Sequence, residues 1–237
     1  MNQMRTGDEF VLLYNELEQT LKKKTRVFDR RFTELIEAAK NIPGMRGNLD
    51  KLRAMGNLRN AIVHEKGYPT TFVADPRQEI VDDLKKILGM INSPLLVGQR
   101  FKAAPRTFDV HSTLTEILAH MKQHDYSQVV IAIEGHYKIL TSEAIVRWIS
   151  KAEHEIVDLE GVQAAAVHKH EGPDVQQWIS RNSPVDDVVQ AYENALKQGI
   201  PRIHAILVTK NGKPTEKPSG IVTPWDLIDL IKEMYDE

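Results

Sequence analysis

The 237-residue chain contains no cysteine. That absence excludes disulfide bonds, thiolate metal ligands and cysteine nucleophiles, and it leads us to expect a cytoplasmic protein. No apolar run approaches the roughly 20 residues needed to cross a bilayer. The stretch Met1 to Glu9 carries charges of both signs and lacks the apolar segment of a secretory signal. Aromatic residues are scarce at 6%, but 41% hydrophobic and 27% charged residues are typical of a globular protein long enough for two domains.

Residues 1–93 are predicted to form an α-helical bundle, because apolar residues recur at helical spacing in four stretches. Asp75-Pro76 is predicted to start the last helix as an N-cap followed by a first-turn proline, and Asn92-Ser93-Pro94 is the predicted domain boundary. The four stretches contain Phe10, Leu13, Leu17 and Leu21; Phe28, Phe32, Leu35, Ile36 and Ala39; Leu49, Leu52, Met55, Leu58 and Ile62; and Ile80, Leu84, Ile87, Leu88 and Ile91.

Residues 94–237 contain an internal repeat, with copies at about 97–150 and 174–237. The run that starts at Ser112 resembles the run that starts at Ser183. Each run is predicted to be a helix that leads to a β-branched strand, at 128–133 and 202–208, then to a second short strand and a second helix. The second copy has a longer connection, which we expect between Lys210 and Ser219. The chain is therefore predicted to be α+β, with a helical bundle followed by two similar α+β copies.

The second copy contains Gly220-Ile221-Val222-Thr223-Pro224-Trp225-Asp226. With the repeat, this motif resembles the tandem pair of cystathionine-β-synthase-type (CBS) domains, and the resemblance covers about 140 residues. It implies that an adenine nucleotide (AMP, ADP or ATP) is bound as a regulatory ligand. Asp226 would hold the ribose diol, while Thr223, Pro224 and the adjoining helix start would face the phosphates. A carboxylate suits vicinal hydroxyls, and free N–H groups at a helix start suit an anion.

A simpler interpretation of the same residues is a helix cap. Thr-x-x-Asp before an apolar run resembles a capping box, and Pro224 stands at a favoured first-turn position. The first copy keeps the matching threonine, Thr141, which the resemblance also makes a candidate nucleotide-binding residue, but it has Ala144 where the ribose aspartate is expected. We therefore expect one nucleotide per chain, bound in the second copy.

The helical domain contains Arg59, Asn60 and His64 near the end of its third stretch. An arginine, a polar residue and a histidine at this spacing resemble the HEPN family of helical domains, and the resemblance covers roughly residues 8–92. It implies a metal-independent ribonuclease that acts as a dimer, with these three residues as catalytic candidates. The same spacing recurs at Arg106 and His111, outside the bundle, so spacing alone proves nothing.

RNA cleavage by its own 2′-hydroxyl needs a base, an acid and a cation for the phosphate charge. Histidine and arginine suit these roles. Arg59 and His64 would lie about 140° apart on one helix, so two facing copies are needed, and a homodimer is expected. The simpler alternative is that Arg59 forms a salt bridge and His64 stabilises its helix end.

The remaining histidines give weaker signals. His120 and His124 lie four residues apart on one predicted helix, but the sequence places no third metal ligand beside them, so a solvated face is expected and no metal is predicted. The sequence leaves two interpretations open. The first is a nucleotide-sensing regulatory protein with a ribonuclease domain, and RNA as a further partner. The second is a nucleotide-binding module whose helical domain only dimerises or docks a partner. No membrane partner is expected.

Overall fold

The computed structural model describes residues 5–28, 31–64, 75–151, 159–173, 176–200 and 202–235. It mixes helices and strands, and it divides into two compact units, Met1–Leu95 with Glu233–Glu237, and Leu96–Lys232. We call them the N-terminal unit and the C-terminal unit. No helix among the described residues combines the length and apolar character that a membrane span requires.

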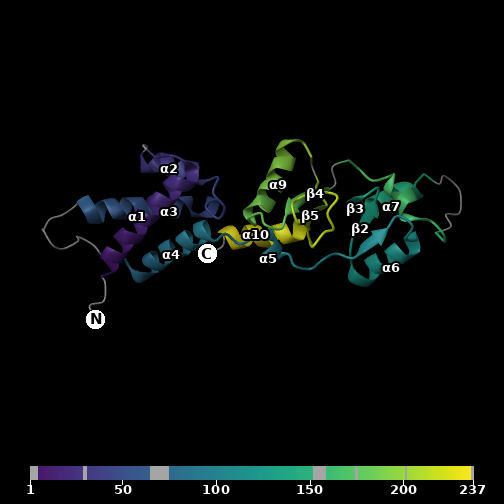
Figure 1. Ribbon diagram of the computed structural model, residues 1–237, viewed down its shortest axis with the longest axis horizontal. Helices are drawn as coiled ribbons and strands as arrows, with labels where there is room; N and C mark the ends of the chain where they lie inside the picture. The colour runs from purple at the N-terminus through teal and green to yellow at the C-terminus, as the bar shows by residue number, and fades with distance from the viewer. Residues whose placement is uncertain are drawn as a thin grey trace. The chain divides into compact units, whose positions relative to one another are not determined.

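The described part of the N-terminal unit is helical (Figure 1). α1 packs against the other three α-helices, and α2 packs against α3. Its core includes the fully buried Phe10, Leu17, Leu35, Leu52 and Leu84, so each of the four predicted stretches contributes to it. The elements are α1 (Thr6–Thr25), α2 (Phe32–Ala39), a 3-10 turn η1 (Arg46–Asn48), α3 (Leu49–His64) and α4 (Gln78–Asn92).

Two local predictions for this unit are wrong. Phe28 lies outside α2 and is 58% exposed, because Arg26 adopts a left-handed conformation that ends α1 and α2 begins only at Phe32. Asp75 does not cap α4, which begins at Gln78 after an extended Arg77. The Asp75 carboxylate instead lies 3.6 Å from the guanidinium of Arg5.

The C-terminal unit repeats one arrangement twice (Figure 1). In each half a parallel strand pair and an antiparallel pair share the middle strand, which gives the orders β1-β2-β3 and β4-β5-β6. The elements are α5 (Val97–Arg100), β1 (Thr107–Asp109), α6 (Leu114–His124), β2 (Gln128–Ile133), β3 (His136–Thr141) and α7 (Ser142–Ile149), then α8 (Ala164–His168), β4 (Gln176–Ser180), α9 (Asp186–Lys197), β5 (Ala205–Thr209), β6 (Gly220–Val222) and α10 (Pro224–Tyr235).

The structure adds β1 and β4, which the sequence did not indicate, and it starts β5 at Ala205 rather than at Arg202. The antiparallel strands differ in their connections. β2 and β3 are joined by Glu134 and Gly135, which both have positive φ and form a tight hairpin turn. β5 and β6 are joined by residues 210–219, as expected for the longer connection.

The two sheets pack face to face. Side chains alternate between the two faces of a strand, so Val129 and Ile131 lie in the core under α6, α7 and α8, while Val130 faces the other sheet. The contact between the sheets contains Val130 and Ile139 from the first half and Ala205 and Leu207 from the second, all buried.

The first helix of each half packs against the other half. Before α5, Leu96 bridges to Pro184, and the amide of Val97 donates to the carbonyl of Ser183 at 2.8 Å. Before α8, Gln163 bridges to Thr113, and Ala164 packs in the core of the first half. As a result, the segment that follows α5 lies beside the second half, and the segment that follows α8 lies beside the first half.

Candidate functional site

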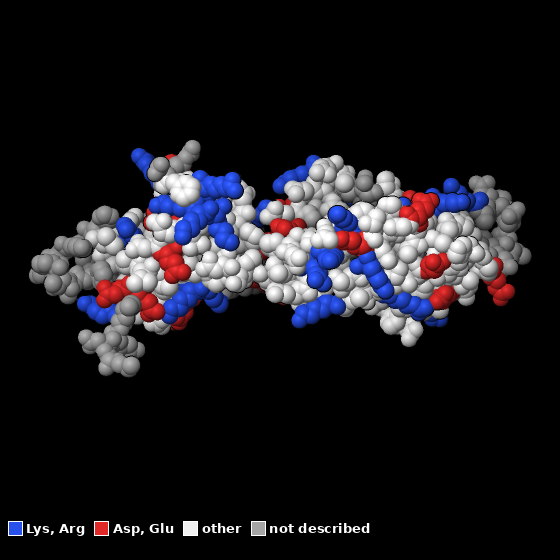
Figure 2. Space-filling model, in the orientation of Figure 1, with Lys and Arg blue, Asp and Glu red and all other residues white. Residues whose placement is uncertain are grey.

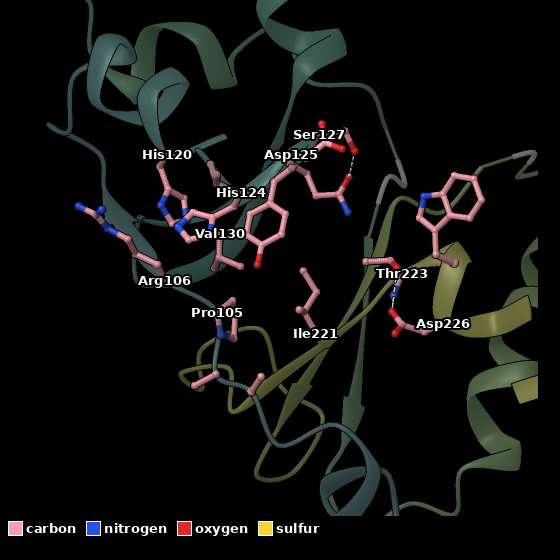
Figure 3. A pocket seen from close by; sticks show the side chains of 16 residues that line it. Pro105, Arg106, His120, His124, Asp125, Ser127, Val130, Ile221, Thr223 and Asp226 are labelled. Atoms are coloured by element: carbon pink, nitrogen blue, oxygen red, sulfur yellow. Dashed lines mark hydrogen bonds between the residues drawn. The ribbon is translucent and has the colours of Figure 1, made fainter. Parts of the chain in front are cut away.

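A cavity of about 590 Å³ lies within the C-terminal unit and is bounded by both halves (Figure 3). Its lining comes from the segment after α5, the end of α6, the start of β2 and the β6–α10 junction. The lining residues are Ala103, Ala104, Pro105, Arg106, His120, His124, Asp125, Tyr126, Ser127, Gln128, Val129, Val130, Ile221, Thr223, Trp225 and Asp226.

Thr223 and Asp226 form one wall of this cavity (Figure 3). The carboxylate oxygen Oδ2 of Asp226 accepts hydrogen bonds from the amide and the hydroxyl of Thr223, both at 2.7 Å. This contact caps α10, as the simpler interpretation expected, but it occupies only one oxygen. Among the described residues no hydrogen bond engages Oδ1 of Asp226 or the amides of Trp225 and Asp226. A carboxylate oxygen and two N–H donors are therefore available at this wall.

The opposite wall is aromatic. Asp125 adopts a left-handed conformation that ends α6, and the amide of Tyr126 then donates to the carbonyl of Met121 at 2.9 Å. This turn stacks the Tyr126 ring on His124 with centroids 5.3 Å apart, and His120 lies 4.5 Å from His124. Tyr126 is 54% exposed, so the wall presents open ring surface on which a planar group can stack.

Arg106 brings a positive charge to the same side of the cavity (Figure 3). Its guanidinium lies 4.6 Å from the centre of the Phe108 ring and forms an ion pair with Glu116. Burial lowers the pKa of His120, and the charges of His124 and Arg106 add to this effect. His120 is therefore a neutral ring near pH 7, and Arg106 is the cation of this wall.

Gly220 sets the path of the segment that forms the edge of the cavity. A Cβ atom at Gly220 would lie 2.4 Å from the carbonyl oxygen of Phe101. That segment continues through Ala103 and Ala104 to Arg106, all of which line the cavity. The glycine of the motif therefore allows a backbone approach, and the approach positions the cavity edge.

A second cavity of about 380 Å³ shares Ser127, Gln128, Thr223 and Trp225 with the first. Pro224 lines this second cavity, as do Arg202 and His204. Trp225 is 80% exposed, although it is the largest side chain on either lining. Of the predicted nucleotide residues, Thr223 and Asp226 line the larger cavity and Pro224 the smaller.

Thr141, the fourth predicted nucleotide residue, is fully buried and lines neither cavity, although it is the β3 partner of the cavity residue Gln128 on β2. Its hydroxyl accepts from the amide of Ala144 at 3.1 Å and donates to Glu171 Oε1 at 3.0 Å. Its amide donates to Glu171 Oε2 at 2.8 Å. In the first half a carboxylate from a distant segment therefore holds the threonine.

The predicted catalytic residues lie on α3 of the N-terminal unit. Arg59 is half-buried, and its buried Nε has no hydrogen-bond partner among the described residues. Burial raises the pKa of Tyr14 on α1, the charge of Glu18 raises it further, and the charge of Arg59 opposes them. Asn60 is exposed, and His64 is the last residue of α3, with a side chain outside the described part of the chain.

Sequence reasoning missed most of the cavity wall. It treated Arg106 as a chance match and His120 and His124 as a solvated face. The available signal was the four-residue spacing of the histidines followed by Tyr126, but only the fold shows that this helix end faces the β6–α10 junction. No group of three metal-binding side chains forms among the described residues.

Buried histidines predict a loss of stability in acid. Burial lowers the pKa of His204, which is 7% exposed, and the charge of Arg202 lowers it further. His204 therefore binds a proton more readily in the unfolded chain than in the folded chain. The free energy of unfolding that the neutral ring contributes above about pH 6.5 is lost as the pH falls. Urea midpoints at pH 7.5 and 5.5 should differ less for His204→Gln than for the wild type. His111→Gln, at an exposed position, is the matched control; an unchanged difference in His204→Gln would contradict the assignment.

Comparison with known proteins returns no matching family model and no matching curated protein. Solved structures do match. A CBS domain-containing protein of unknown function from Kribbella flavida is 15% identical, with a TM-score of 0.43, and the match covers 58% of this chain and 97% of that one. The CBS domain of a membrane protein from Sphaerobacter thermophilus is 20% identical, with a TM-score of 0.42, and covers 63% and 95%.

The CBS domain pair of protein MJ0100, solved with 5′-methylthioadenosine and S-adenosyl-L-methionine, is 19% identical, with a TM-score of 0.43, and covers 59% of this chain and 98% of that one. At these identities and TM-scores, the three likenesses assign neither a ligand nor an activity to this chain.

Proposed function

We propose that the C-terminal unit is a CBS-type regulatory module that binds one adenine nucleotide in the larger cavity. The observation that carries this proposal is the geometry of Asp226. Its Oδ2 is held by Thr223 at 2.7 Å, which leaves Oδ1 without a hydrogen bond from the described residues at a cavity wall. A fixed carboxylate with a free oxygen is suited to accept hydrogen bonds from the vicinal hydroxyls of a ribose.

The rest of the cavity offers groups for the other parts of a nucleotide. Val130 and Ile221 provide apolar surface, and Tyr126 provides a ring for stacking by the base. The amides of Trp225 and Asp226 at the start of α10 suit phosphate oxygens. A volume of about 590 Å³ lies within the usual range for small-molecule sites. No metal takes part in this proposal.

The test is calorimetric titration of the full chain with AMP, ADP and ATP. We expect saturable binding of one nucleotide per chain, because only the second half combines a threonine with a free aspartate oxygen. Absence of binding for all three nucleotides would contradict the proposal. Binding of two equivalents would contradict the assignment to a single half.

For the N-terminal unit we propose a second candidate function, cleavage of single-stranded RNA without metal by a dimer. Two observations favour it. Lys and Arg side chains gather over α2 and α3 on the face seen in Figure 2, and Asn60 is exposed on α3. A basic surface suits a phosphate backbone, and His64 would transfer the proton.

This second proposal predicts that labelled RNA incubated in chelator is cut to products with a 2′,3′-cyclic phosphate. His64→Ala should stop the cutting, whereas the control His111→Ala should not. Intact RNA, or equal cutting by His64→Ala, would contradict the proposal. The unit would then serve for dimerisation or partner docking, which sedimentation of the full chain measures.

A further inference from the structure

Thr223 in the second half and Thr141 in the first half make the same kind of hydrogen bonds to a carboxylate. In the second half, the amide and hydroxyl of Thr223 both donate to the carboxylate of Asp226, three residues later in the first turn of α10. In the first half, the amide and hydroxyl of Thr141 both donate to the carboxylate of Glu171, which lies thirty residues later. The same pair of donors therefore meets a carboxylate in each half, although Ala144 provides none.

Glu171 is held firmly in this position. Its side chain is 6% exposed, and a buried carboxylate is costly unless donors surround it. Besides the two donors of Thr141, the amide of Gly172 donates to Oε1 at 3.0 Å, and Arg147 lies 3.9 Å from the same oxygen. The guanidinium of Arg147 also donates to the carbonyl of His170 at 3.2 Å, which fixes the segment that presents the carboxylate.

The exchanged leading helices explain how this carboxylate arrives. The segment after α5 reaches the second half, and there it presents Ala103 and Ala104 to an open cavity. The segment after α8 reaches the first half, and there it presents Glu171 to Thr141. The two segments therefore correspond in position but differ in side chains. The one after α5 has alanines beside the open cavity, and the one after α8 has the carboxylate of Glu171 beside Thr141.

We propose that the chain itself closes the first half. Glu171 takes the place of the aspartate that is absent at the matching position, Ala144, and its carboxylate excludes a nucleotide from this half. The excluding part of this inference rests on the proposed function, whereas the replacement of the aspartate does not. The module is then asymmetric. The Glu171 carboxylate always occupies the site in the first half, and only the site in the second half binds a ligand.

The replacement is tested without any ligand, by hydrogen exchange of the Thr141 amide in the ¹⁵N-labelled full chain. Glu171→Gln keeps the size of the side chain and removes its charge. Exchange at Thr141 should become roughly tenfold faster, because the neutral amide oxygen of glutamine accepts a weaker hydrogen bond than a carboxylate does. The amide of Thr223 in the same unit should keep its rate and reports any global loss of stability. Glu193→Gln, which removes a carboxylate from α9, is the control. An unchanged rate at Thr141 would overturn the proposal.

The exclusion is tested by the number of AMP molecules bound to four proteins. The wild type and Ala144→Asp should each bind one, because both keep the blocking carboxylate. Glu171→Ala lacks the aspartate of the first half, so it should bind a second AMP at least roughly tenfold more weakly than the first. The double variant E171A/A144D should bind two. A second AMP bound by Ala144→Asp alone, or a double variant that folds and binds only one, would overturn the exclusion. If the wild type binds none, the proposed function fails, and the exchange experiment still decides whether Glu171 replaces the aspartate.

Discussion

Asp226→Ala is expected to weaken the binding of AMP roughly tenfold to a hundredfold, the range for loss of hydrogen bonds to a charged group. The carboxylate is the group we assign to the ribose hydroxyls, and one of its oxygens already accepts from Thr223. Removing it takes away the acceptor and loosens the start of α10 at the same time. Calorimetric titration of wild type and variant measures the change in affinity.

Two further variants separate ligand contact from helix capping. Asp229→Ala removes an exposed carboxylate one turn further along α10 and should bind AMP like the wild type. Asp226→Asn keeps an oxygen that accepts from the Thr223 amide, so it should retain most of the stability and still lose affinity. Wild-type affinity in Asp226→Ala would remove this carboxylate from the site, whatever its effect on stability.

Gly220→Ala is expected to lower the free energy of unfolding by about 1–3 kcal/mol, the usual cost of forcing an extra methyl group into packed structure. The added Cβ would meet the Phe101 carbonyl oxygen at 2.4 Å, and a backbone atom cannot move aside as the end of a flexible side chain can. Because the displaced segment leads to Arg106 at the cavity edge, nucleotide affinity should fall together with stability.

Gly89→Ala is the matched control for this effect. Apart from the neighbouring backbone of α4, no atom of the described residues lies within 4 Å of a Cβ atom built at Gly89. Its replacement should therefore leave stability unchanged or raise it slightly, since alanine favours the helix. Urea unfolding followed by circular dichroism measures both variants. Equal stability of Gly220→Ala and wild type would show that the segment yields without cost and that the glycine does not position it.

The sequence predicted those parts of the fold that depend on local periodicity. The four apolar stretches correspond to α1 to α4, and the strand at 128–133 is β2. β1 and β4 were missed because they are short, at three and five residues, and because each is completed by a parallel partner far along the chain. Phe28 was misplaced because periodicity does not show that Arg26 ends its helix in a left-handed conformation.

The residues of the candidate site also fall into those that a local pattern predicts and those that only the fold brings together. Thr223 and Asp226 belong to one contiguous motif, so one repeat was enough to find them. The wall made by Arg106, His124 and Tyr126 depends on how α6 and the segment after α5 meet the second half, which no local pattern encodes. The role of Glu171 was equally out of reach, because it follows from an exchanged helix that brings the residue to Thr141.

Amide chemical shifts of the ¹⁵N-labelled full chain locate bound AMP directly and so test whether the nucleotide binds beside Asp226. We predict that saturating AMP shifts the amides that border the larger cavity and leaves the amide of Gly172 in place. The shifted amides should be those of Ala103, Ala104, Arg106, residues 126–130, Ile221, Thr223, Trp225 and Asp226. Shifts centred on Thr141, or shifts confined to the N-terminal unit, would contradict the account, because the nucleotide would then bind away from Asp226.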